Sequence, residues 1–199
     1  MNSLSRVFLL AGVLVIAPST EAANIVANAG FESVYASWTF GSWFVCSGGF
    51  GAHSGTSFAC NGQLTPTTLS QALVTDPGTS YDLSFWLGQV NGAGSSDNHY
   101  VAVTWAGALV YDSRNDTLAN FQNHWVQISI PALQATTSTT VLAFTGLNVP
   151  SNWDLDDVSV SPSAPASSAP EPNTLALCFV GAATVLSRIR RGASPNNHH

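Results

Sequence analysis

Positive charge is nearly missing from this chain of 199 residues, which contains no lysine and only five arginines. Between residues 23 and 169 the single cation Arg114 stands against nine carboxylates, a net charge of −8 with histidine neutral. Such a segment repels nucleic-acid phosphates and anionic lipid surfaces. The sequence therefore predicts no nucleic-acid partner. With charged residues at only 8% of the chain, charged disorder is excluded as well.

The chain also lacks any apolar run of the roughly 20 residues that a membrane-spanning helix needs. At the N-terminus, Arg6 precedes a short apolar stretch, and Thr20 and Ala22 supply small residues at positions −3 and −1 of a cleavage site. We therefore interpret residues 1–22 as a secretory signal peptide and expect export. A membrane anchor or a buried helix is the alternative, but the apolar stretch is only about half a span.

No segment between residues 23 and 161 sustains a helical period. Residues 80–88 instead alternate, with Leu83 and Phe85 on one face and Asp82 and Trp86 on the other. Four further segments show the same strand-like pattern: 99–112, 124–131, 138–147 and 153–161. Short strands separated by turns predict one all-β domain, an antiparallel β-sandwich, over residues 23–161.

Cysteine is scarce, with three residues in the chain. Cys46 and Cys60 lie 14 residues apart in the segment predicted to be exported, where a disulfide persists. Closing that loop would stabilise the fold by about 3 kcal/mol. Two free buried thiols are the alternative. Cys178 has no partner left in the chain.

The C-terminal part has three sections. Residues 162–169 form a Pro/Ser/Ala linker. Residues 173–187 carry no charge and would give a helix of roughly 22 Å, a marginal span for a hydrocarbon core of about 30 Å. Three arginines follow and would stay on the cytoplasmic side by the positive-inside bias. They are Arg188, Arg190 and Arg191.

The order Pro170-Glu171-Pro172, apolar helix and arginine cluster resembles the PEP-CTERM sorting signal of Gram-negative bacteria that make exopolysaccharide. The resemblance covers residues 170–193 and leaves 194–199 as a polar tail. It implies recognition by an exosortase, a membrane cysteine protease, with the Pro-Glu-Pro segment as its substrate. The alternative is a plain C-terminal anchor that is never processed.

Within the predicted domain, four segments occur in the order seen in galactose-binding-like jelly rolls, the fold of many non-catalytic carbohydrate-binding modules. They are "NIVANAGFES", "AHSGTSFA", "SQALVTDPGTSYDLSFWLG" and "WDLDDVSVS". The resemblance implies that fold. Sugar binding has to be argued from a site, because one fold hosts many functions.

The jelly-roll resemblance also implies a structural calcium ion, the only cofactor that we predict. The matching ligands are Glu32 and Asp156 or Asp157, with backbone carbonyls of residues 53–56 as additions. Calcium takes six to eight oxygen ligands. The alternative is that these carboxylates accept hydrogen bonds in loops and face water.

Tryptophan is abundant for so small a domain, with six in the chain. Exposed indole rings stack against the apolar faces of sugars. We therefore take Trp38, Trp43 and Trp86 as candidates for glycan stacking. The alternative is that these large aromatic side chains plug the ends of the sandwich.

No catalytic motif is present in the sequence. There is no Gly-x-Ser-x-Gly elbow, and the carboxylates outside residues 154–157 stand singly in turns. The sequence predicts a non-catalytic cell-surface or matrix protein, anchored transiently in the inner membrane, sorted by an exosortase-like enzyme and associated with exopolysaccharide. The alternatives are a specific glycan-binding module and a hydrolase with an unrecognised site.

Overall fold

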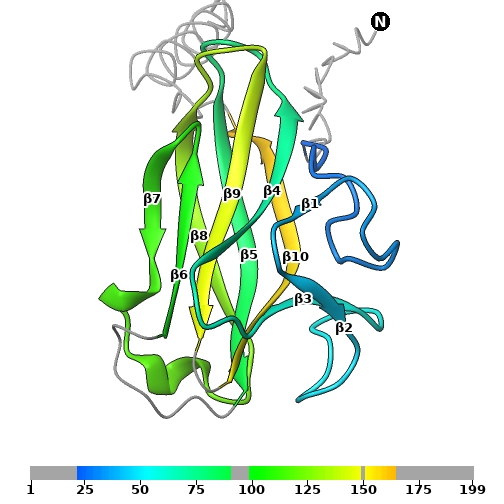
Figure 1. The fold of residues 1–199 in the computed structure, drawn as a ribbon. Helices are drawn as coiled ribbons and strands as arrows, with labels where there is room; N and C mark the ends of the chain where they lie inside the picture. The colour runs from blue at the N-terminus through cyan, green and yellow to red at the C-terminus, as the bar shows by residue number, and fades with distance from the viewer. Residues whose placement is uncertain (1–21, 91–98, 149–150, 165–199) are drawn as a thin grey trace, which may run out of the picture. The chain divides into compact units, whose positions relative to one another are not determined.

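The computed structural model describes residues 22–90, 99–148 and 151–164 (Figure 1). The predicted signal peptide, most of the linker and the PEP-CTERM-like segment lie outside these residues. Contacts divide the chain into one unit ending at Ser163 and another beginning at Ala164. No helix in the described part is long and apolar enough to cross a membrane.

The described residues form two five-stranded antiparallel sheets that pack face to face (Figure 1). Sheet A contains, in spatial order, β1 (Thr39–Phe40), β4 (Thr67–Val74), β9 (Thr139–Asn148), β6 (His99–Trp105) and β7 (Ala108–Asp112). Sheet B contains β2 (Phe44–Cys46), β3 (Phe58–Asn61), β10 (Asn152–Pro162), β5 (Ser80–Val90) and β8 (Val126–Gln134). Two 3₁₀ turns, η2 (Ser113–Asn115) and η3 (Leu118–Phe121), connect β7 to β8. The predicted all-β antiparallel sandwich is confirmed.

The alternation along β5 decides which side chains form the core. Leu83, Phe85 and Leu87 are buried between the sheets, and Phe85 packs edge-to-face on Phe144 of sheet A with ring centroids 5.2 Å apart. In the segment 99–112, strand phase predicts that Trp105 points inward together with Val101 and Val103, and Trp105 is indeed 3% exposed. Burying a large apolar side chain stabilises a fold by about 1.5–3 kcal/mol, so this inner layer holds the two sheets together.

Trp38 and Trp43 lie in the core, and the expectation that they are exposed is wrong. Trp38 is 7% exposed, packs on Phe31 and Phe144, and donates its indole N–H to the Asn28 carbonyl. Trp43 is 3% exposed and lies against Gly146, where an added Cβ would come within 2.7 Å of the indole. The segment that carries these two tryptophans folds onto the sandwich, because burying an indole ring stabilises the fold more than leaving the ring exposed in a loop.

Cys46 and Cys60 form the predicted disulfide, with Cα atoms 6.1 Å apart. The bond joins β2 to β3, in which Cys46 pairs with Phe58 and Cys60 with Phe44. It therefore fixes the short outermost strand β2 to its neighbour in sheet B.

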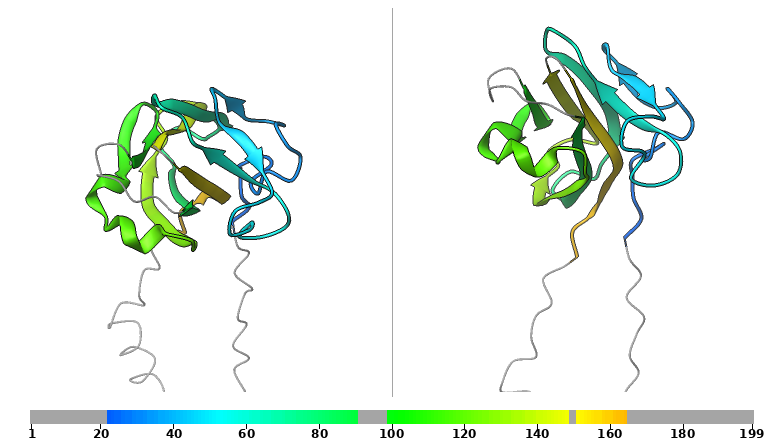
Figure 2. Two further views of the ribbon diagram at one scale, coloured as in Figure 1. Left: turned by 60° about the horizontal axis from the view of Figure 1, so that its bottom comes forward. Right: turned by 90° about the horizontal axis from the view of Figure 1, so that it is seen from below.

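The first described residues run beside β10, the last strand. Ile25 donates to the Val160 carbonyl, and the Asn24 side chain bonds the backbone of Val158 and Val160. The two ends of the described domain consequently lie close together, as the blue and orange ends in Figure 2 show.

Candidate functional site

The three carboxylates predicted to hold calcium all contact one loop, residues 53–57. The Glu32 carboxylate accepts hydrogen bonds from the Thr56 N–H at 2.7 Å, the Ser57 N–H at 2.8 Å and the Thr56 hydroxyl at 2.8 Å. The backbone N–H of Thr56 is the main reason why the pKa of Glu32 lies below its usual value. Glu32 is therefore held in its charged form by the loop.

Asp156 is fully buried beneath the same loop. Its carboxylate accepts the N–H groups of His53 at 2.9 Å, Ser54 at 3.2 Å and Asp157 at 2.8 Å. Burial raises the pKa of Asp156 to about 6 despite these donors.

Asp157 points toward the loop as well, because β10 is irregular between Asp156 and Ser159 and Asp157 adopts a φ of +46°. Without such a bulge, successive side chains of a strand face opposite sides. Asp157 accepts from His53 Nδ1 at 2.5 Å and from the Ser54 hydroxyl at 2.8 Å.

This arrangement does not fit a calcium ion. The carboxylate oxygens of Glu32, Asp156 and Asp157 receive N–H and O–H donors, whereas calcium requires oxygens that converge on the ion. Among the residues that the structure describes, no three His, Cys, Asp or Glu side chains form a metal-binding group. Calcium remains an expectation of the family resemblance alone, and the geometry favours the alternative of carboxylates that accept hydrogen bonds from a loop, although Asp156 is buried and does not face water.

The tryptophans on the outer face of sheet B anchor the long loop between β2 and β3. Trp86 is half-buried, and the imidazole of His53 stacks on it. Trp125 is half-buried as well and packs against Phe50 and Phe58. An added Cβ at Gly88 would collide with the Phe50 ring, so this loop lies directly on β5. Trp86 faces outward as its strand phase predicts, but a loop side chain stacks on its ring.

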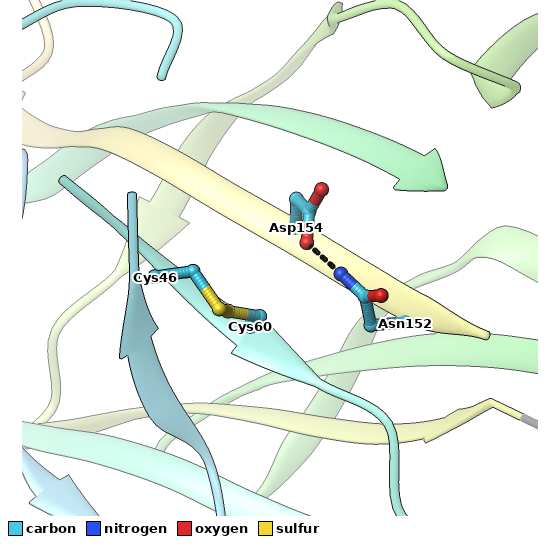
Figure 3. Close-up of a disulfide and its surroundings, with 4 residues drawn as sticks. All are labelled: Cys46, Cys60, Asn152 and Asp154. Carbon is cyan, nitrogen blue, oxygen red and sulfur yellow. Dashed lines mark hydrogen bonds between the residues drawn. A yellow bond between two sulfur atoms is a disulfide. The ribbon is translucent and has the colours of Figure 1, made fainter. Parts of the chain in front are cut away.

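A buried carboxylate that the sequence did not single out lies under the same loop. Asp154 pairs with Cys60 of the disulfide on one side and with Gly88 on the other, and it is fully buried. Its Oδ1 accepts from the Asn152 side chain, as Figure 3 shows, and its Oδ2 has no partner within the described residues. Burial raises the pKa of Asp154 to about 7.

An open groove of about 400 Å³ crosses the outer face of sheet B next to this loop-covered region. We call it the serine groove; its lining residues are Asp82, Leu83, Ser84, Ser129, Ile130, Pro131, Ser159 and Ser161. Ser129, Ser84 and Ser159 lie directly opposite one another on β8, β5 and β10. Because neighbouring strands lie about 4.8 Å apart, their hydroxyls form a regular row across the sheet.

Most polar side-chain atoms that line the serine groove make no hydrogen bond within the described residues. Within the described residues, the hydroxyls of the four lining serines make no hydrogen bond. Asp82 uses Oδ1 to accept the Ala132 N–H at 2.9 Å and the Ser163 hydroxyl at 2.5 Å. The Ser163 hydroxyl is the main cause of the lowered pKa of Asp82, which keeps the carboxylate charged. The groove therefore presents free hydroxyls beside a fixed acceptor.

His53 and Ser54 of the loop and Asp157 of β10 have the identities of a hydrolase triad but not its geometry. His53 and Ser54 both bond Asp157, so no histidine stands between the hydroxyl and the carboxylate. A catalytic triad needs the base within reach of the nucleophile. His99 is fully buried, and His124 bonds the Gln122 carbonyl. Within the described residues, no serine is paired with a histidine base.

Comparison with known proteins identifies the fold. The sequence matches no protein-family model and no curated protein. Among solved structures, TmCBM61 in complex with beta-1,4-galactotriose matches with a TM-score of 0.52 and 18% identity, over 71% of this chain and 100% of that one. The CBM22-1 xylan-binding domain of Paenibacillus barcinonensis Xyn10C matches with a TM-score of 0.50 and 13% identity, over 75% and 100%.

An enzyme fragment shares the architecture. The enzymatically active domain of bacteriophage CBA120 tailspike protein 4 matches with a TM-score of 0.50 and 12% identity, over 70% of this chain but only 21% of that one. Identities this low concern the fold alone. The described domain therefore has the two-sheet jelly-roll fold of these carbohydrate-binding modules.

Proposed function

We propose that this chain is an exported, non-catalytic glycan-binding module whose sugar site is the serine groove. The row of unpartnered hydroxyls on Ser129, Ser84 and Ser159 carries the proposal. Sugar hydroxyls both donate and accept hydrogen bonds, and serine hydroxyls do the same. Asp82 adds a charged acceptor, and bonds to a charged group are the stronger ones.

The charge of the groove favours a neutral glycan. Asp82 is the only ionised lining residue, and the domain around it is strongly acidic. A polymer of uronic acids or sulfated sugars would be repelled. A volume of about 400 Å³ is within the range of ligand sites, roughly 300–1,000 Å³.

The apolar part of this sugar site comes from Pro131 on β8, since the neighbouring Ile130 pairs with Leu83 and packs against the core on the inner face of sheet B. Trp86 lies two positions from Ser84 on the same face of β5, but its ring is stacked by His53. We therefore leave Trp86 out of the proposed contact surface. Binding would depend on hydrogen bonds more than on stacking.

Export, sorting and location complete the proposal and rest on the sequence. The signal peptide over residues 1–22 would direct export. Pro170–Pro172, the apolar run and the arginines would present the chain to an exosortase-like protease in the inner membrane. A glycan-binding module released there would associate with exopolysaccharide at the cell surface or in the matrix. A purely structural matrix role is the second candidate, favoured by the small share of charged residues in the chain, 8%.

Glycan arrays and calorimetry with neutral polysaccharides test the binding. The triple variant Ser84→Ala, Ser129→Ala, Ser159→Ala should weaken binding about tenfold or more, because each lost hydrogen bond contributes roughly 0.5–1.5 kcal/mol. The matched control replaces Thr68 and Thr145 by Ala, a hydroxyl pair on the outer face of sheet A. Equal binding by wild type and triple variant would exclude the groove. A wild-type protein that binds no glycan would leave the structural role.

A further inference from the structure

The interior of the sandwich is polar instead of apolar at one end. At this end, at the bottom of Figure 1, β5 and β9 finish and β6 and β10 begin. The inner positions of these strands carry apolar side chains along most of their length. At this end the inner positions of these four strands and of β3 carry polar groups, all 0–1% exposed: Asn61 of β3, Gln89, His99, Asn148 and, with its indole N–H, Trp153. We call these five residues the buried polar layer.

The strand register brings the members of this layer together. In sheet A, His99 pairs directly with Asn148. In sheet B, Trp153 pairs with Gln89 on one side and with Asn61 on the other. Gln89 Nε2 lies 3.0 Å from His99 Nδ1, so the layer spans both sheets. Phe121 of η3 is 1% exposed and packs edge-on against Trp153, which closes this end of the core.

Six atoms of the buried polar layer have no hydrogen-bond partner among the described residues. They are Asn61 Oδ1, Gln89 Oε1, His99 Nε2, Asn148 Nδ2, Asn148 Oδ1 and Trp153 Nε1. Buried polar atoms are almost always hydrogen-bonded, because water is lost on burial and an unmade bond costs free energy. Six such atoms in one layer therefore indicate an occupant.

The chemistry of these atoms identifies the occupant. With Gln89 Nε2 donating, His99 Nδ1 accepts, so the proton of the neutral imidazole is on Nε2. The layer then offers donors on His99, Asn148 and Trp153, and acceptors on Gln89, Asn148 and Asn61. A cation would use only the acceptors and an anion only the donors. Water uses both, and no carboxylate of the layer is present to favour a metal ion.

We propose that the buried polar layer binds ordered internal water. A buried water makes about three hydrogen bonds, so six atoms correspond to about two molecules that bridge sheet A to sheet B. The water would act as part of the core at this end, bridging polar side chains of sheet A to polar side chains of sheet B. The inference is independent of glycan binding.

Nuclear magnetic resonance of the ¹⁵N-labelled protein tests it through cross-relaxation between indole protons and water. The Trp153 indole proton should show a cross peak with the sign of long-lived water. Trp43 and Trp105 are buried too, but their indoles donate to the carbonyls of Thr67 and Gln134, so they should show none. Because the Trp43 indole bonds Thr67, Trp43 also shows whether a threonine hydroxyl that exchanges its proton with water gives a false cross peak.

The comparison lies within one folded protein, so it does not depend on a variant that folds poorly. Trp153→Phe assigns the resonance, because it removes the indole and keeps an aromatic ring against Phe121. A Trp153 proton without a water cross peak, like those of Trp43 and Trp105, would overturn the proposal. A water cross peak on all three indoles would overturn it as well, since the signal would then not be specific to the layer.

Discussion

The imidazole of His53 lies parallel to the indole of Trp86, with ring centroids 3.8 Å apart and an angle of 16° between the planes. The same imidazole bonds Asp157 at 2.5 Å. Three different segments of the chain therefore meet at one histidine, and the loop between β2 and β3 is held on sheet B.

Replacing His53 by Ala should uncover the Trp86 ring and destabilise the protein by about 1–2 kcal/mol. Aromatic stacking contributes roughly 0.5–1.5 kcal/mol, and a hydrogen bond to a charged group adds to it. Tryptophan fluorescence should shift to the red as water reaches the indole, with stability measured by urea unfolding. His124→Ala is the control, since His124 is exposed and makes no ring contact with Trp86. Unchanged fluorescence in His53→Ala would show that the ring is covered by something else.

Asp154 should make stability fall as the pH rises from about 4 to 8. The folded state raises its pKa from 3.8 to about 7, so the folded protein binds the proton more tightly than the unfolded chain does. The penalty is absent below the unfolded pKa and complete above the folded one. Asp154→Asn should reduce this dependence, leaving the part due to Asp156, and stabilise the protein at pH 8 by up to about 4 kcal/mol. Urea unfolding at pH 5 and pH 8 measures both. If Asp154→Asn were less stable than wild type at pH 8, the buried charge of Asp154 would not be destabilising, and the prediction would be wrong.

Gly55→Ala should destabilise the protein more than Gly107→Ala does. Both glycines have positive φ, +60° and +82°, so both substitutions incur backbone strain of about 1 kcal/mol or more. Only at Gly55 would the new Cβ also strike the Glu32 carboxylate; at Gly107 it meets nothing within 4 Å. Melting temperatures of the two variants give the difference. Equal losses would mean that Glu32 does not hold the loop.

Calcium should leave the melting temperature unchanged. A ligand that binds only the folded state raises stability, so a bound ion would be seen as a loss on chelation. We expect identical transitions in calcium and in EDTA, because loop donors already satisfy the carboxylates of Glu32, Asp156 and Asp157. A higher melting temperature in calcium would show that these carboxylates turn to an ion, as the family resemblance implies.

Strand alternation predicted the two-sheet sandwich, because a period of two assigns each side chain to one face whatever its partner strand is. It placed Leu83, Phe85 and Trp105 inward and Trp86 outward correctly. It made no prediction for Trp38 and Trp43, which lie in a Gly/Ser-rich segment with short strands. There the sequence has no period to show which side faces the core.

Less of the candidate site could be predicted from the sequence. The row of Ser129, Ser84 and Ser159 joins three strands that are distant in sequence, and only their register places the hydroxyls in line. Each serine alone looks like an ordinary outward residue of a strand.

The sequence by itself determined the strands β5 to β10, their inward faces, the disulfide partners and the acidity of the domain, because these follow from local periodicity, spacing and composition; it did not show the strands β1 to β4. Tertiary structure alone decided that a loop covers Trp86, that the carboxylates face N–H donors and that six polar atoms share one buried layer. Those features depend on which strands become neighbours and in what register, and the hydrogen bonds that fix this join residues up to 136 positions apart.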